Sequence, residues 1–205
     1  VRKFDTRSGQ IIWEYKLNAG DDPAPVEGYA AMTLNEDSSI IAIPFDHKLI
    51  ALWTATGLPL WKRPCKFDDK VRQIAFIKTG LIVSGGPNTR TSYHRCFMAL
   101  LNIDNGIPIW KKELKRGKTL TNFILAQDRA MALCDSALLT VNIKDGSYRD
   151  LTRSIKLKGS EDPRLIQRFE GNLFLETSSE LLLISDSGGI IYHSVFDLGN
   201  DDLDL

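Results

Sequence analysis

The sequence contains little that would support nucleic-acid binding or membrane insertion. Its 26 basic and 26 acidic side chains cancel, so no basic excess points to a nucleic-acid partner. The longest uncharged apolar runs have the length of a strand, well below the roughly 20 residues that span a bilayer. We therefore expect neither nucleic acid as a partner nor a transmembrane segment in this chain, although association with a membrane complex stays open.

Cysteine is scarce as well. The three cysteines, Cys65, Cys96 and Cys134, lie far apart in apolar contexts. An odd number in such contexts favours buried thiols, with one disulfide and one thiol as the alternative. Reduced thiols favour a reducing compartment. An exported or lumenal location stays open, because a leader that had been removed would leave no trace.

Signatures of catalysis are missing too. The pair Gly85 and Gly86 lacks the Lys-Ser/Thr of a phosphate-binding loop, and no Gly-x-Ser-x-Gly elbow occurs. Neither His47 nor His193 has a second histidine or a cysteine at metal-ligand spacing. We expect no catalytic residue, no metal site and no cofactor.

The sequence does contain a repeat. Five times, an apolar run leads into a polar turn and a glycine, and the glycines recur every 40 to 49 residues. The glycines are Gly9, Gly57, Gly106, Gly146 and Gly188, and the residues four positions on are Trp13, Trp61, Trp110, Asp150 and Tyr192. A period of about 40 to 50 residues is typical of a β-propeller.

Each repeat is expected to form a four-stranded antiparallel meander, or blade. Apolar strands alternate with turns rich in Asn, Asp, Ser and Gly, such as the polar turn at residues 35–38. The outer strand of the first full blade is expected at residues 58–61, and two strands of the second full blade at residues 81–84 and 97–101. Such a sheet is apolar on both faces, so it must stack on a copy of itself, and radial stacking gives a propeller. The expected blades are 1–17 (partial), 29–64, 71–114, 120–152 and 165–196.

We therefore predict an all-β fold: a single domain over residues 1–205 with about four full blades after an N-terminal half blade. The half blade supplies third and fourth strands, and the acidic tail 197–205 is too short to supply the two that are missing. The chain is thus expected to be part of a larger propeller. An open ring, or a gap filled by a partner, are the alternatives.

The glycine and the tryptophan of each repeat have structural explanations. Glycine allows the tight turn between the third and fourth strands. An indole on the fourth strand can cover the seam with the adjacent blade and still find a partner for its N–H. We interpret the tryptophans as packing residues rather than as an aromatic cage for a ligand.

Three of these phrases, at residues 5–13, 56–61 and 105–110, resemble the repeat of the quinoprotein-like (PQQ-repeat) propellers. A divergent WD40-like propeller ranks second, because residues 50–57 resemble a WD40 blade but Trp-Asp and Gly-His dipeptides are absent. The first resemblance implies a quinone and a calcium ion over a central tunnel, and in many members a disulfide of adjacent cysteines. Adjacent cysteines do not occur here, so dehydrogenase activity is not expected.

Binding is expected where a loop breaks the repeat. Residues 85–95 interrupt the second full blade, and Arg90, Tyr93, His94 and Arg95 combine cationic and aromatic groups, as interface hot spots do. A solvated hairpin extension is the alternative. We predict a non-catalytic scaffold that binds other protein subunits, or further domains of the same protein, in a larger complex. The alternative is a ligand- or carbohydrate-binding propeller, or an enzyme with its site over the central channel.

Overall fold

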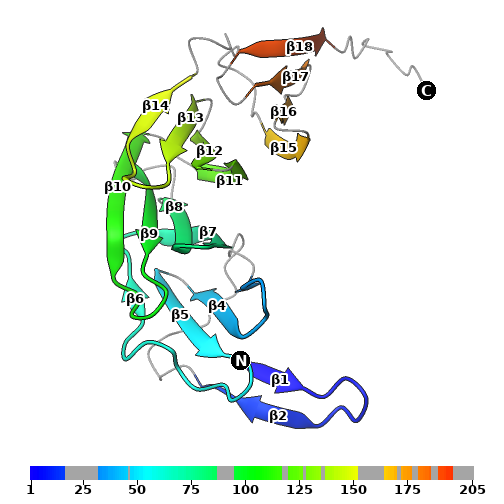
Figure 1. The fold of residues 1–205 in the computed structure, drawn as a ribbon, viewed down its shortest axis with the longest axis vertical. Coiled ribbons are helices and arrows are strands. Elements are labelled where there is room, and N and C mark those ends of the chain that lie inside the picture. Colours follow the sequence, from blue (N-terminus) through cyan, green and yellow to red (C-terminus); the bar gives the residue numbers. More distant parts are fainter. Residues whose placement is uncertain are drawn as a thin grey trace, which may run out of the picture. The chain divides into compact units, whose positions relative to one another are not determined.

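The computed structural model describes residues 1–16, 32–45, 47–86, 95–116, 120–126, 128–134, 137–151, 164–169, 172–176, 180–185 and 189–195. These residues form strands and turns and no helix. The strands make one two-stranded and four four-stranded antiparallel sheets (Figure 1). This is the architecture of a partial β-propeller, which confirms the predicted fold class. The chain divides into two compact units, Val1–Arg116 and Gly117–Leu205.

The first unit holds a hairpin and two complete blades, each hydrogen-bonded in chain order. The half blade consists of β1 (Arg2–Phe4) and β2 (Ile11–Glu14). The first blade consists of β3 (Thr33–Leu34), β4 (Ile40–Phe45), β5 (Lys48–Trp53) and β6 (Cys65–Lys66). The second blade consists of β7 (Lys70–Ile77), β8 (Gly80–Gly86), β9 (Arg95–Leu101) and β10 (Pro108–Arg116).

The second unit holds two more blades of the same topology. The third blade consists of β11 (Leu120–Ala126), β12 (Arg129–Cys134), β13 (Ala137–Asn142) and β14 (Tyr148–Asp150). The fourth blade consists of β15 (Arg164–Phe169), β16 (Asn172–Glu176), β17 (Glu180–Ile184) and β18 (Ile190–Val195). Within this unit the two blades pack through their innermost strands, β11 and β15.

The cores of both units lie between blades, because the middle strands are apolar on both faces. In the first unit Leu49 of β5 and Leu81 of β8 are fully buried in one cluster that joins the two blades. In the second unit Leu133 of β12 and Leu182 of β17 share a cluster in the same way. Each such side chain contributes about 2 kcal/mol by leaving water. Stacking therefore stabilises blades that would be unstable alone.

One expected strand is wrong. Residues 58–61 do not form the outer strand of the first blade, which instead lies at Cys65–Lys66. This segment is tied to β5 by a bridge between Leu52 and Pro59. Two hydrogen bonds accompany it, from Trp53 N to Leu58 O at 2.9 Å and from Leu60 N to Ala51 O at 2.8 Å. The ladder is interrupted because residues 60–63 bend away from β5, and pairing resumes only where Leu49 meets Cys65. Proline is not the cause, since Pro108 stands at the same place in the next repeat and begins β10.

Candidate functional site

The seam between the half blade and the first blade is closed by Trp13. Its indole lies over Gly57 so closely that a methyl group on this glycine would come within 2.6 Å of Trp13 Cδ2. The ring Nε1–H donates to Thr54 O at 2.9 Å. Gly57 has a φ of +71°, a left-handed conformation that favours glycine. The turn is thus shaped to accept the ring of the preceding blade.

The next seam repeats this contact. The indole of Trp61 lies over Gly106, again with 2.6 Å between Trp61 Cδ2 and a methyl group added to the glycine. Its Nε1–H donates to Ile103 O at 2.6 Å, and the ring is buried. Thr54 and Ile103 each stand three residues before the receiving glycine. In both seams of the first unit, a tryptophan ring therefore packs on the turn glycine of the next blade and donates its N–H to the carbonyl three residues before that glycine.

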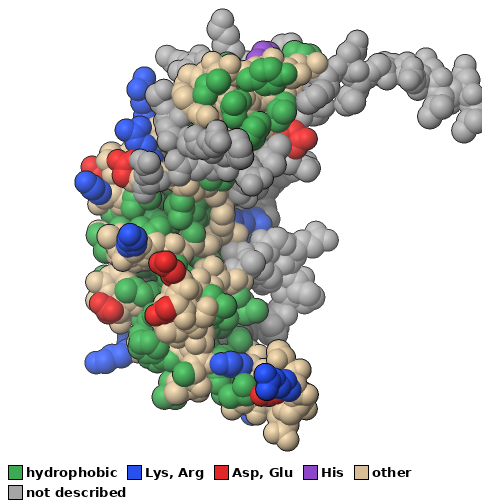
Figure 2. All heavy atoms as spheres, turned by 45° about the vertical axis from the view of Figure 1, so that its right-hand side comes forward, with side chains coloured by type: hydrophobic (Ala, Val, Ile, Leu, Met, Phe, Trp, Pro, Cys, Tyr) green, Lys and Arg blue, Asp and Glu red, His purple; other side chains and the backbone are tan. Residues whose placement is uncertain are grey.

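The other repeat positions differ from one another. Trp110 is buried, whereas Asp150 is exposed and the buried neighbour is Leu151. Tyr192 is 55% exposed. Figure 2 shows apolar side chains gathered over the fourth blade, at the top of the view, where Ile190 and Ile191 of β18 are exposed as well.

Of the loop expected to bind partners, residues 85–95, only a part belongs to the described residues. Arg90, Tyr93 and His94 lie outside the described residues, as does Gly188. Gly85 and Gly86 belong to β8, and the backbone of Arg95 begins β9. The interaction role of this loop stays a prediction.

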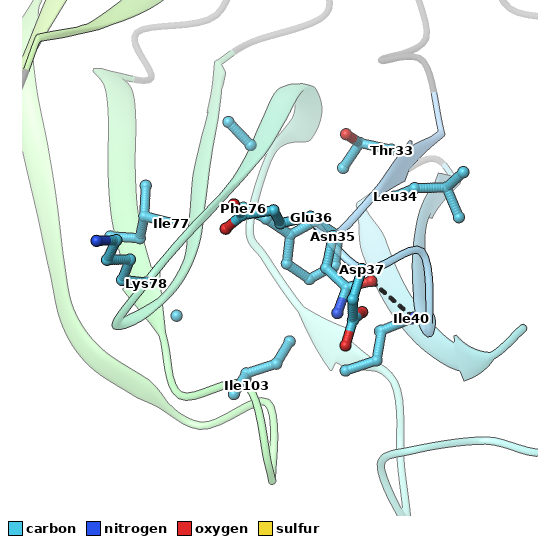
Figure 3. Close-up of a pocket in the computed structure, with 12 residues that line it drawn as sticks. Thr33, Leu34, Asn35, Glu36, Asp37, Ile40, Phe76, Ile77, Lys78 and Ile103 are labelled. Carbon is cyan, nitrogen blue, oxygen red and sulfur yellow. Dashed lines mark hydrogen bonds between the residues drawn. The ribbon is translucent and has the colours of Figure 1, made fainter.

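The described residues do form a groove elsewhere, on the seam between the first and second blades (Figure 3). Its open volume is about 900 Å³. One wall is the turn between β3 and β4, the other is the turn between β7 and β8, and Ile103 lies below them. The residues that line it include Leu34, Glu36, Asp37, Ile40, Phe76, Ile77, Lys78 and Ile103. We call this the seam groove.

The seam groove combines an apolar floor with charged edges. Ile40 is buried and Phe76 and Ile103 are half-buried, whereas Glu36, Asp37 and Lys78 are exposed. The hydroxyl and the backbone N–H of Ser39 hold the pKa of Asp37 below its usual value of 3.8, and the N–H donates to Asp37 Oδ1 at 2.9 Å. This carboxylate is therefore charged at neutral pH.

The walls of the groove are fixed by local hydrogen bonds. Ile40 N donates to Asn35 Oδ1 at 2.9 Å, drawn as a dashed line in Figure 3, and Asn35 Nδ2 donates to Ser39 Oγ at 3.1 Å. On the other wall Gly80 has a φ of +155°, and a methyl group there would clash with the backbone of Leu101. Both turns are thus held in one conformation.

The sequence reasoning missed this groove. Glu36 and Asp37 were assigned to a polar turn, which is correct but says nothing of what the turn faces. The missing signal was positional: corresponding turns of successive blades lie on the same side of a propeller, so residues 35–37 and 77–80 become neighbours. Corresponding positions in the two turns are more than 40 residues apart, and this hides the relationship in the sequence.

The groove offers an apolar floor and charged groups on both walls for binding. In the part of the chain that the structure describes, no three His, Cys, Asp or Glu residues lie close enough to hold a metal ion. Nor does any described helix have the length and apolarity to cross a membrane.

The fold resembles solved propellers of different kinds. BamB from Moraxella catarrhalis matches with a TM-score of 0.62 and 18% identity, over 91% of this chain and 56% of BamB. The WD40 domain of Neurospora crassa Pan2 matches with a TM-score of 0.59 and 12% identity, over 82% of this chain and 50% of that domain. A chain of a mitotic checkpoint complex matches with a TM-score of 0.60 and 9% identity, over 89% of this chain and 60% of that one.

No protein-family model and no curated protein matches the sequence. The chain spans between half and three-fifths of the length of the solved chains named here. At these identities the likeness shows the fold alone. Whether the repeat is of the PQQ or the WD40 type stays a prediction.

Proposed function

We propose that this chain is a non-catalytic scaffold that binds other proteins, and that the seam groove takes up an extended segment of a partner. The observation that carries the proposal is the groove itself, about 900 Å³ with an apolar floor between two charged walls. Propellers present such surfaces on a rigid frame, and interaction scaffolding is the role expected from the sequence.

The chemistry of the groove defines the segment that would fit. An apolar side chain of the partner would cover Phe76 and Ile103, which are half-buried now. A basic residue beside it would face Glu36 and Asp37, and an acidic residue would face Lys78. Complementary charge at such a rim contributes mainly to orientation and to the rate of association.

The rigidity of the seam supports this role. Ile103 belongs to the turn that receives Trp61, so the floor of the groove is held by the indole contact between the two blades. Because the site is already ordered, little conformational entropy is lost when a partner binds, and preorganised sites bind more tightly for this reason.

The test is affinity purification followed by quantitative mass spectrometry. Glu36→Lys reverses one charge of the groove, and Ile103→Asp places a charge on its floor. Glu176→Lys is the matched control, because Glu176 is an exposed carboxylate on the fourth blade. We expect both groove variants to lose the same set of partners at least tenfold, while the control retains them.

A deletion of residues 89–94 separates the seam groove from the loop predicted from the sequence. Partners lost with this deletion, and retained by both groove variants, would assign binding to the loop and overturn the proposal for the groove. Circular dichroism of each variant, compared with the native chain, shows whether the strands are intact.

A further inference from the structure

The half blade ends in the same turn as the complete blades. Gly9 N donates to Asp5 O at 2.8 Å, and Asp5 N donates to Gln10 O at 2.8 Å. The same bond, to the residue four positions earlier, closes the turns at Gly57 (2.8 Å) and Gly106 (2.9 Å). The three glycines have φ values of +70°, +71° and +71°. The turn at Gly9 is therefore built like the two that receive an indole.

The three turns differ in what covers the glycine. A methyl group added to Gly57 or to Gly106 would come within 2.6 Å of a tryptophan ring. Around Gly9, no described atom lies within 4 Å of that position. The half blade thus has the same glycine turn as the two that pack against an indole, but no described ring lies on it.

The strand before this turn is equally uncovered. Phe4 stands five residues before Gly9, as Leu52 and Leu101 stand before their glycines. Leu52 and Leu101 are fully buried, whereas Phe4 is 50% exposed. Among the described strands β1 pairs with β2 alone, so its other edge offers backbone groups to a further strand.

We propose that the half blade is a docking surface for a further propeller segment in a larger ring. Strands of that segment extend the sheet along β1 and cover Phe4, and a tryptophan on the outer strand of its neighbouring blade lies over Gly9. The indole N–H donates to Thr6 O, because Thr6 holds the place that Thr54 and Ile103 hold at the other seams. This inference does not depend on the seam groove.

The competing occupant is a second copy of this chain. Tyr192 stands in the repeat position of the tryptophans and is 55% exposed, so β18 of another copy could approach Gly9. A phenol carries its hydroxyl at the far end of the ring, whereas an indole carries its N–H on the side. Only the indole repeats the contacts made by Trp13 and Trp61, and we therefore assign the site to a tryptophan.

The first test uses asparagine at the glycines, because asparagine tolerates a positive φ but would clash with a ring packed on the glycine. In the 205-residue chain we expect Gly57→Asn and Gly106→Asn to lower the urea midpoint and Gly9→Asn to leave it nearly unchanged. In the protein expressed from its own gene in its source cells, Gly9→Asn should lower the midpoint as much as Gly57→Asn. A neutral Gly9→Asn in both contexts would overturn the proposal.

The second test is hydroxyl-radical footprinting of the native protein in both contexts. Phe4 should be modified readily in the 205-residue chain and at least fivefold more slowly in the protein from its source. Leu58, which is 62% exposed on the first blade, is the control and should react equally in both. Equal modification of Phe4 in both contexts would contradict the docking surface.

Intact mass and sedimentation identify the occupant. Protection of Phe4 in a monomer whose polypeptide exceeds 23.0 kDa supports the further propeller segment. Protection only in a dimer of 23.0 kDa chains, lost on Tyr192→Ser, would overturn that assignment in favour of a second copy.

Discussion

The indole of Trp61 covers Gly106 on the next blade and donates its N–H to a carbonyl of the same turn, Ile103 O, at 2.6 Å. The indole thus occupies space that any side chain at position 106 would need. The contact fixes the spacing of two blades and also holds the floor of the seam groove.

Removal of the Trp61 ring should destabilise the first unit strongly. Trp61→Ala deletes a buried ring and leaves a cavity, which costs about 3–5 kcal/mol. Trp61→Phe keeps most of the packing but leaves Ile103 O without its donor, a loss of roughly 1–2 kcal/mol. The free energy of unfolding, measured by urea denaturation, checks both values.

Trp53 supplies the control for these variants. Its ring is 42% exposed, so Trp53→Ala should change the free energy of unfolding by less than about 1 kcal/mol. Equal losses for Trp53→Ala and Trp61→Ala would show that the seam contact contributes nothing beyond the presence of an aromatic ring.

Two adjacent glycines in β8 should respond differently to alanine. A methyl group on Gly85 would come within 2.5 Å of the Phe97 ring and would also clash with Lys70 O. On Gly86 it would meet only atoms of Cys96 at ordinary contact distance, the nearest being Sγ at 3.4 Å. We expect Gly85→Ala to lose about 1–3 kcal/mol, as overpacked cores do, and Gly86→Ala to stay near the native value.

Thermal unfolding followed by circular dichroism compares the two glycine variants directly. The expected order of melting temperatures is native, then Gly86→Ala, then Gly85→Ala. The reverse order of the two variants would mean that Phe97 moves aside freely, which would contradict its stacking on Phe67 at a centroid distance of 5.0 Å.

The thiol of Cys65 should react slowly with alkylating reagents. Burial raises its pKa from 9.0 to about 11, against the opposing effect of Lys111. Since the thiolate is the nucleophile, iodoacetamide at pH 8.5 should modify Cys65 about 100-fold more slowly in the folded chain than in urea. Mass spectrometry of the Cys65 peptide over time measures both rates.

The same shift predicts a dependence of stability on pH. The folded chain holds the Cys65 proton more tightly than the unfolded chain, so this contribution is complete below pH 9 and is lost as the pH rises toward 11. Cys65→Ser should show a smaller loss of stability over that range. An unchanged alkaline profile in this variant would mean that Cys65 is not the group responsible.

The turn of the half blade should loosen in acid. The backbone N–H groups of Ser8 and Arg7 both donate to Asp5 Oδ1 at 2.8 Å, and they hold the pKa of Asp5 below 3.8, with the Ser8 N–H as the largest cause. The stabilisation of the turn is therefore present above pH 3.8 and is lost as the pH falls through the lower, folded-state pKa.

Nuclear magnetic resonance of the Ser8 amide proton follows this transition. Its chemical shift should change as Asp5 is protonated below pH 3.8. Asp5→Asn keeps an acceptor oxygen without a titrating group, so its Ser8 shift should stay constant between pH 5 and pH 2. A transition that persists in Asp5→Asn would assign it to another group.

The strands of the blades could be predicted closely because their signals are local. The strands expected at residues 81–84 and 97–101 lie within β8 and β9, where apolar runs end at turn residues. The outer strand expected at residues 58–61 was wrong because residues 60–63 bend away from β5 and interrupt the ladder. A strand forms where the backbone can hydrogen-bond as well as where the side chains are apolar.

The candidate site was less accessible to sequence reasoning. Polar turns such as residues 35–38 were recognised, but the seam groove arises only when this turn faces the one that contains Lys78. The tryptophans were assigned to seams, yet their repeat position does not reveal which glycine each ring covers. Such contacts join different repeats, and no pattern within one repeat encodes them.

Taken alone, the order of residues determined the repeat, the turns and the strands, because each depends on interactions among neighbours along the chain. Tertiary structure decided that Trp13 covers Gly57, that Trp61 covers Gly106, and that no atom of the described residues covers the turn at Gly9. The reason is that stacking brings together side chains more than 40 residues apart, and their fit depends on the distance between two sheets rather than on the composition of either.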